Sequence, residues 1–178
     1  IRLTMTFPGC ISAILAFCRQ WPKNRIKVLP GIELTHLPLE QFKRAASFAR
    51  DNGIKVIVAH GETLVEPVIK GTARAALQAD IDILSHPGLI TPEDVKLAAK
   101  KEIFLEISCR KGHCLGNGHV AQLAKKFGAK LCINSDSHAP SDIPTPAFMR
   151  QVGLAAGLGP KDLEKICRDA RLFIEKAS

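Results

Sequence analysis

Histidines and carboxylates recur at the ends of short apolar runs along this 178-residue chain. Glu33, His60, His86, Glu106 and Asp136 each close such a run, and successive members lie 20 to 30 residues apart. That interval is about one strand–helix unit, so we expect the five side chains at the same edge of a parallel sheet. Converging imidazoles and carboxylates are typical of a Zn, Mn or Fe site. The spacing therefore predicts a divalent metal site.

Three further residues extend this expected site. His138 follows Asp136 at a spacing of two, and side chains two apart at a strand end point the same way. Arg110 and His113 belong to the loop that follows Glu106. This loop suits the binding of a phosphate monoester, but it could equally be a solvated basic turn. A metal ion beside it would polarise a phosphoryl oxygen and lower the pKa of a bound water.

Structural roles compete with these chemical ones. A lone histidine at a strand end is more often a hydrogen-bonded structural residue than a ligand. Glu106 could accept a hydrogen bond from a ligating histidine instead of binding the ion itself. Glu62 and Glu66 could simply begin a helix, where carboxylates are favoured.

Short β-rich apolar runs alternate with segments of helical periodicity from residue 26 onward. Bounded apolar runs favour strands that are covered on both faces. Regular alternation of strands and helices predicts a parallel sheet, either open or closed into a barrel. The predicted strands are residues 26–32, 55–59, 81–84, 103–107 and 131–133, and the predicted helices are 39–51, 66–78, 92–101, 119–127, 147–156 and 160–176.

Composition bounds the class of protein. Apolar residues make up 46% of the chain and charged residues 24%, which is the balance of a globular protein of one domain. No apolar run approaches the roughly 18–20 residues that span a bilayer, so no membrane partner is expected. Six cysteines without a Cys-x-x-Cys pair favour reduced thiols and a cytoplasmic location. The net charge is +8, and residues 1–50 carry eight Lys/Arg against two acidic residues.

Seven segments carry the polar motifs in chain order: residues 31–36 (GIELTH), 58–63 (VAHGET), 82–91 (DILSHPGLIT), 105–108 (LEIS), 110–113 (RKGH), 117–119 (NGH) and 133–140 (INSDSHAP). Over residues 26–175, this set resembles the polymerase and histidinol phosphatase (PHP) family, and most closely its stand-alone histidinol-phosphatase-like members. The resemblance implies a distorted (β/α)7 TIM-like barrel that holds up to three Zn, Mn or Fe ions.

The resemblance also implies roles for individual residues. Glu33 would bridge ions, His60 and His86 would bind one ion beside it, Asp136 would bind a second ion and His138 a third. Asp136 and His138 would then serve catalysis, and Arg110 and His113 would orient the phosphate. The implied reaction is attack of a metal-bound hydroxide on the phosphorus of a small phosphorylated substrate.

The start of the chain departs from the family pattern. No His-x-His strand end is present, and Leu3-Thr4-Met5-Thr6 stands where the family has Thr-Asp-His. Residues 1–5 would then form the second strand of the barrel, and the first strand would be missing from a single domain over residues 1–178. With these ligands absent, about one metal ion is expected. The exposed barrel edge would allow oligomerisation.

Two hypotheses follow from the resemblance. The first is a metal-dependent phosphoesterase, weak or inactive in this truncated chain, for which nucleic acid is not an expected partner. The alternative is a catalytically impaired PHP-like barrel acting as a structural or RNA-binding subunit, a role known for one degenerate branch in ribonuclease P. RNA would then bind the basic N-terminal segment through Arg19, Lys23, Arg25 and Lys27. The joint presence of the later strand-end ligands favours the first hypothesis.

Overall fold

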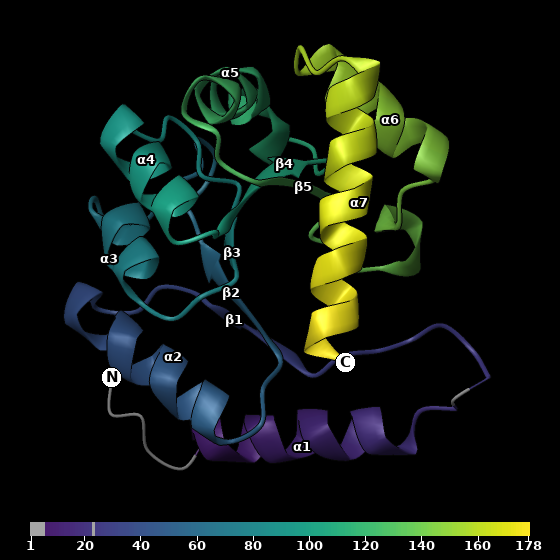
Figure 1. Cartoon of the computed structure of the whole chain (residues 1–178). Coiled ribbons are helices and arrows are strands. Elements are labelled where there is room, and N and C mark those ends of the chain that lie inside the picture. Colours follow the sequence, from purple (N-terminus) through teal and green to yellow (C-terminus); the bar gives the residue numbers. More distant parts are fainter. Residues whose placement is uncertain (1–5, 23) are drawn as a thin grey trace.

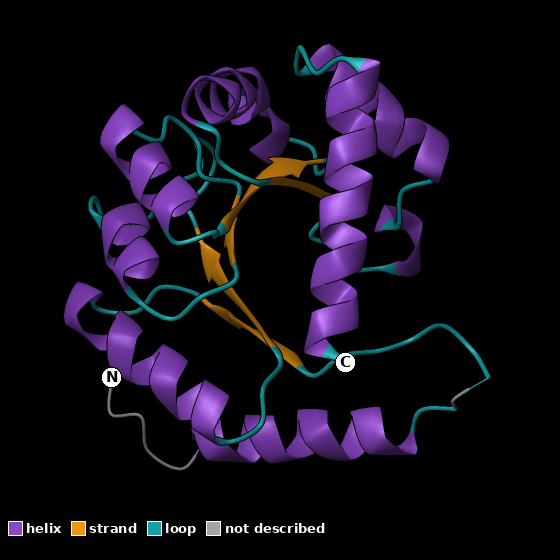
Figure 2. Cartoon of the chain, viewed as in Figure 1, coloured by secondary structure: helices purple, strands orange, loops and turns teal. Residues whose placement is uncertain are grey.

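Strands and helices alternate along the chain from Gly31 onward (Figures 1 and 2). The computed structural model describes residues 6–22 and 24–178. The strands are β1 (Gly31–Leu34), β2 (Val56–His60), β3 (Ile83–Ser85), β4 (Phe104–Ser108) and β5 (Leu131–Asn134). The helices are α1 (Thr6–Gln20), α2 (Phe42–Asp51), α3 (Thr72–Gln78), α4 (Pro92–Lys100), α5 (Asn117–Phe127), α6 (Pro146–Ala155) and α7 (Pro160–Ala177), with short 3₁₀ helices η1 (Leu39–Gln41), η2 (His113–Gly116) and η3 (Pro140–Asp142).

The five strands form one parallel sheet in the order β1-β2-β3-β4-β5. Its register places Glu33 beside Val58 and His60 beside Ser85, so the carboxyl ends of neighbouring strands meet at one edge. Every residue of β4 is buried, as expected for a central strand covered on both faces. The five predicted strands and their parallel arrangement are confirmed. The ends of the last four are shifted by one or two residues, whereas the first begins at Gly31 and not at the predicted residue 26.

The sheet is open, so the predicted distorted (β/α)7 barrel is wrong. Among the described residues, β1 pairs only with β2 and β5 pairs only with β4, which leaves both as edge strands. A barrel needs its first and last strands to pair. The five short strands instead follow an arc, and helices α6 and α7 contact β5 where the sheet ends (Figure 2).

Helix α1 precedes the sheet and was not predicted from the sequence. Its apolar residues Phe7, Ile11, Ile14 and Leu15 recur at helical spacing, and Ile11 is buried. The Phe7 ring lies 5.8 Å from the ring of Phe48, so α1 packs beside α2 (Figure 1). The strand predicted for residues 1–5 lies outside the described residues.

The predicted helix over residues 66–78 is too long, because α3 begins at Thr72. Glu62 fixes this start: its Oε1 accepts hydrogen bonds from the backbone N–H groups of Gly71 and Ala73, both at 3.0 Å. A carboxylate in this position satisfies orphan donors and complements the helix dipole. Glu66 therefore lies in a loop and is free to face the carboxyl ends of the strands.

One cluster of buried side chains joins the sheet to the surrounding helices. Leu84 and Leu105 of the central strands are fully buried, and Ala46, Ala76 and Ala98 bring α2, α3 and α4 into the same cluster. Within the described chain, no helix has both the length and the apolar character needed to cross a membrane. All six cysteines are free, and Cys132 is buried.

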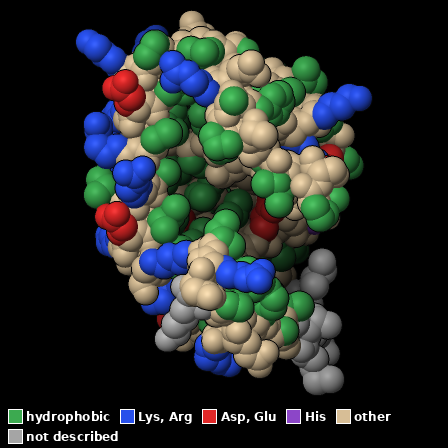
Figure 3. All heavy atoms as spheres, turned by 90° about the vertical axis from the view of Figure 1, so that its right-hand side faces the viewer, with side chains coloured by type: hydrophobic (Ala, Val, Ile, Leu, Met, Phe, Trp, Pro, Cys, Tyr) green, Lys and Arg blue, Asp and Glu red, His purple; other side chains and the backbone are tan. Residues whose placement is uncertain are grey.

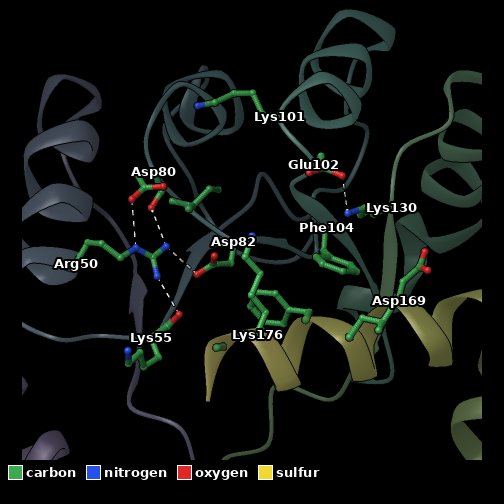
Figure 4. Close-up of a pocket in the computed structure, with 14 residues that line it drawn as sticks. Arg50, Lys55, Asp80, Asp82, Lys101, Glu102, Phe104, Lys130, Asp169 and Lys176 are labelled. Carbon is green, nitrogen blue, oxygen red and sulfur yellow. Dashed lines mark hydrogen bonds and ion pairs between the residues drawn. The ribbon is translucent and has the colours of Figure 1, made fainter.

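A charge network holds the amino ends of the strands (Figure 4). Arg50 Nη2 lies 2.9 Å from Asp82 Oδ2, and Arg50 Nε lies 3.2 Å from Asp80 Oδ2. Glu102 and Lys130 form another pair at 2.8 Å. These residues line a cavity of about 550 Å³. Because their charges are already paired with one another, we do not take this cavity as a binding site. The network therefore positions α2, β2 and β3, and the histidines gather at the opposite end of the strands.

Candidate functional site

Three buried histidines meet at the carboxyl ends of β2, β3 and β4. The rings of His60 and His86 lie edge to face with centroids 4.4 Å apart, and the rings of His86 and His113 stack at 4.1 Å. His60, His86 and His113 are 7%, 2% and 4% exposed. His60 ends β2, His86 directly follows β3, and His113 follows β4 after a short loop. The parallel register brings these strand ends together, so the three histidines meet.

Two groups of side chains are compact enough to hold a metal ion. Glu33, His60 and His86 can each offer one ligand atom within 4.8 Å of the others. His86, His113 and Asp136 form the second group by the same measure. His86 belongs to both groups, so it is the geometric centre of the candidate site.

Glu106 orients His86. The carboxylate Oε2 of Glu106 lies 2.9 Å from Nδ1 of His86 and accepts the backbone N–H of the same residue at 2.6 Å. Burial opposes protonation of His86, but Glu106, with help from Glu33 and Asp136, raises its pKa above the ordinary value. Of the two roles considered for Glu106, the structure shows the acceptor role. A carboxylate behind an imidazole is the usual support of a ligating histidine.

His113 is buried in the site and does not face solvent. Its Nδ1 lies 2.7 Å from Thr63 Oγ1, and its Nε2 lies 3.4 Å from Glu66 Oε1 and 3.7 Å from Asp136 Oδ2. Burial lowers the pKa of His113, and the neighbouring His86 lowers it further. The neutral form of the His113 ring is therefore favoured more than in an ordinary histidine. A neutral imidazole is suited to binding a metal ion, whereas binding a phosphate would need the protonated cation.

Glu66 joins the site although its sequence position marked it only as a candidate helix start. Its Oε2 lies 3.1 Å from His60 Nε2, in addition to the Oε1 contact with His113. Burial opposes its ionisation, but His113 and His60 lower its pKa below the ordinary value. Thr63 and Ser85 were also missed; Ser85 Oγ donates to Glu33 Oε1 at 3.1 Å. Thr63 lies in a loop and Ser85 ends β3, and no periodic signal marks either as a site residue.

Arg110, Asp136 and His138 occupy the rim of the site. Arg110 Nη1 pairs with the Asp136 carboxylate and lies 2.8 Å from His138 Nδ1. His138 is exposed, and within the described residues it belongs to neither metal-competent group. The structure therefore brings Glu33, His60, His86, His113 and Asp136 together and leaves His138 outside, with its Nδ1 3.8 Å from Asp136 Oδ1.

Three of the four described non-glycine residues with a positive φ lie at the same edge, and the fourth, Glu102, precedes β4 at the other end of the strands. His36, His86 and Asp136 have φ values of 52°, 28° and 46°, a region that residues other than glycine rarely adopt. His36 also stacks on His60 with ring centroids 5.8 Å apart. Such strain gathers at functional sites, where packing holds side chains in positions that the backbone alone disfavours.

The donor set fits a divalent ion. Imidazole and carboxylate ligands suit Zn, Mn and Fe. Glu106 occupies Nδ1 of His86, so one nitrogen of that ring is left for an ion. Both groups depend on that one remaining nitrogen of His86, so the two groups cannot each bind an ion through it. We therefore expect the site to hold one ion at a time.

No protein-family model matches the chain. The chain is 46% identical over 140 residues to an uncharacterized protein of Methanocaldococcus jannaschii. That alignment covers 78% of this chain and 64% of the relative, which is less than two thirds of the relative's length. In structure, the chain is similar to a chain of archaeal ribonuclease P, solved by cryo-EM with mature tRNA. The TM-score is 0.72 at 21% identity, and the match covers 95% of this chain and 76% of that one.

These findings correct two expectations. Membership of the PHP family is not supported, because no family model matches and the similar solved structure comes from ribonuclease P. Polar residues gather at the carboxyl edge of many open parallel sheets, so short motifs there do not identify one family. The expectation that nucleic acid is not a partner also stands corrected, because the similar solved chain comes from a structure of ribonuclease P with mature tRNA.

Proposed function

We propose that this chain is a non-catalytic, RNA-associated protein subunit. The observation that carries the proposal is the structural similarity to a chain of archaeal ribonuclease P with mature tRNA, which extends over 95% of this chain. The net charge of +8 supports it, because RNA is bound largely through its phosphates. The proposal corresponds to the RNA-binding alternative raised from the sequence.

The basic N-terminal segment offers a surface for RNA. Arg19 lies in the last turn of α1, and Arg25 and Lys27 lie in the loop before β1. All three are exposed and form no ion pair with the described residues. The Phe17 and Trp21 rings lie 5.4 Å apart on the same stretch, and Phe17 is 56% exposed. Cations beside exposed rings can contact both the phosphates and the bases of a single strand.

The face that carries this segment is shown in Figure 3. Lys and Arg side chains are spread around a central hollow whose visible floor is largely hydrophobic, with an acidic side chain at its margin. Such a face offers charge at its rim and apolar surface within, a combination that suits RNA with unstacked bases. Lys23, which the sequence analysis included in the RNA-binding set, lies outside the described residues.

Variants that remove the N-terminal charges test this proposal. We expect Arg25→Gln with Lys27→Gln to weaken the binding of mature tRNA and to reduce the slope of log K against log salt by about one for each phosphate that is no longer bound. The matched control is Lys100→Gln with Lys161→Gln, which removes the same charge from α4 and α7. Equally weakened binding in the two double variants would show that charge alone, rather than this surface, governs binding.

A divalent ion at the carboxyl edge is proposed as a cofactor of the same chain. Glu33, His60 and His86 would hold it, with His113, Asp136 and Glu66 adjacent. A bound ion supplies Lewis acidity, which polarises a phosphoryl oxygen. Among this chain's own groups, Glu106 fixes the His86 ring and Ser85 fixes the Glu33 carboxylate.

Hydrolysis of a phosphoester is the second candidate function, favoured by the contact of Arg110 with Asp136 beside the metal-competent groups. Arg110 would orient a phosphate next to Asp136. Purified protein loaded with Mn or Zn should then cleave a generic phosphomonoester, and Asp136→Asn should remove the activity. If the metal-loaded protein shows no such activity, the phosphoesterase function is excluded and only the RNA-associated role remains.

A further inference from the structure

A groove of about 410 Å³ opens beside the rim of the candidate metal site, and Arg110 is its one lining residue that the proposed functions use. Its lining includes the basic side chains of Arg110 and Lys111 and the apolar side chains of Ile143 and Phe148. These residues come from the loops after β4 and β5 and from the first turn of α6. The groove therefore joins basic and apolar side chains that are far apart in the sequence.

The basic side chains of the groove have N–H donors that are not used by other side chains. Every hydrogen bond that Arg110 makes to a described side chain uses Nη1, so its Nε and Nη2 groups have no side-chain partner there. Lys111 is exposed and forms no ion pair with the described residues. An arginine fixed through one nitrogen and open at the others is suited to a phosphate, which accepts two parallel hydrogen bonds.

One carboxylate also lines the groove, and the backbone engages it. Asp142 Oδ2 accepts hydrogen bonds from the backbone N–H groups of His138 at 2.9 Å and Ala139 at 3.0 Å. Its Oδ1 lies 3.4 Å from Ser141 Oγ. Asp142 and the Asp136 carboxylate that pairs with Arg110 offset the two cations. Anion binding in the groove therefore rests on the free N–H donors of Arg110 and on the unpaired Lys111, and not on an excess of positive charge.

The apolar side of the groove is exposed. Ile143 is 69% exposed and Phe148 is 46% exposed, and neither belongs to the core. A phosphate ion alone would gain nothing from these side chains. A nucleobase would, because an exposed aromatic ring offers a stacking surface that accepts any base.

We infer that this groove binds one nucleotide of single-stranded RNA, with its phosphate on Arg110 and Lys111 and its base on Phe148. The inference rests on the proposed RNA-associated function and specifies where an unpaired segment would lie. Because Arg110 also pairs with Asp136, the phosphate would be held next to the candidate metal site. Duplex RNA keeps its bases stacked and would not fit this arrangement.

Binding of a 5′-phosphorylated five-nucleotide RNA to the whole chain tests the inference. We expect Phe148→Ala to weaken this binding by about tenfold, the order of magnitude for one base stacked on an aromatic ring. Phe148→Tyr, which keeps the ring, should bind as the wild type does. Leu154→Ala is the matched control, since Leu154 is 44% exposed on the same helix and does not line the groove.

Binding of inorganic phosphate tests the basic part of the groove separately from its apolar part. Lys111→Gln should weaken both phosphate and oligonucleotide binding, whereas Phe148→Ala should weaken only the oligonucleotide. An oligonucleotide affinity that is unchanged in Phe148→Ala, or the absence of oligonucleotide binding, would overturn the inference even if tRNA binds. Oligonucleotide binding without tRNA binding would support the groove and count against the proposed association with structured RNA.

Discussion

His86 is the residue on which both metal-competent groups depend. Its ring lies between His60 and His113, its Nδ1 faces Glu106, and its backbone φ of 28° is held by the same carboxylate. An orientation fixed by a buried acceptor leaves little freedom for the remaining nitrogen. The candidate site is thus preorganised around one ring.

Removing one ligand should abolish metal binding. We expect about one Zn or Mn per chain in the wild type and none above background in His60→Ala, measured by elemental analysis after dialysis. Glu106→Gln should keep the ion but weaken its affinity by about 10–100-fold, because His86 is then no longer supported by a carboxylate. His119→Ala should match the wild type, since His119 lies on α5 with its Nε2 2.8 Å from the carbonyl oxygen of Ile90. Unchanged metal content in His60→Ala would contradict the assignment.

The site residues at or near strand ends were predictable, as were Arg110 and His113 in the loop after β4, whereas Thr63 and Glu66 in the loop after β2 were not. Glu33, His60, His86 and Asp136 follow apolar runs, and the parallel register brings such strand ends together. Glu66 enters the site only because Glu62 delays the start of α3. His138 leaves the site because Asp136 adopts a positive φ after β5, which breaks the expected alternation of side chains. Neither effect is visible in a periodic pattern.

Close packing of loops links the elements at the carboxyl edge. A Cβ on Gly61 would lie 2.3 Å from the carbonyl oxygen of Ser85 and 2.7 Å from Cα of Pro87. A Cβ on Gly88, whose φ is 58°, would lie 2.1 Å from the carbonyl oxygen of Glu62. These close approaches leave no room for a side chain, so the loops after β2 and β3 are held against one another at the site.

Gly61→Ala should therefore destabilise the fold by about 1–3 kcal/mol, the usual cost of overpacking. The free energy of unfolding in urea measures the effect. Gly118→Ala is the control: a Cβ there meets nothing within 4 Å, and alanine is favoured over glycine in a helix, so a gain of about 0.5–1 kcal/mol is expected. Equal effects of the two substitutions would show that the close approach at Gly61 carries no strain.

The start of α7 provides a pH-dependent contribution to stability. Lys125 Nζ lies 2.8 Å from Asp162 Oδ2, which also accepts the backbone N–H of Gly159 at 2.8 Å. The Lys125 ammonium, with the Gly159 N–H, lowers the pKa of Asp162 below its ordinary value. The unfolded carboxylate then binds protons more readily than the folded one, so this stability is complete above the unfolded pKa of about 4 and is lost as the pH falls through the folded pKa.

Asp162→Asn should lower the free energy of unfolding at pH 7 by a few tenths to about 1 kcal/mol, since the pair is partly exposed. The difference from the wild type should shrink as the pH falls below about 4. Thermal unfolding between pH 3 and pH 7 measures it. Glu164→Gln on the same helix is the control, and a difference that persists at pH 3 would exclude the ionised form of Asp162 as its source.

At the scale of the whole molecule, the strands could be predicted and the closure of the sheet could not. Apolar runs report which residues are buried, so β1 to β5 were found close to their true positions. Closure depends on whether the edges of β1 and β5 meet, and no local pattern in either strand encodes that pairing. Helix α1 shows a helical spacing of apolar residues that the expectation of a barrel strand obscured.

The association of this open α/β fold with RNA is the central claim, and the affinity of the intact chain for mature tRNA across salt concentrations tests it most directly. The account predicts binding at about 50 mM salt and a linear fall of log K with log salt up to about 200 mM, because binding to phosphates releases counterions. Absence of binding at low salt, or an affinity that does not change with salt, would contradict it.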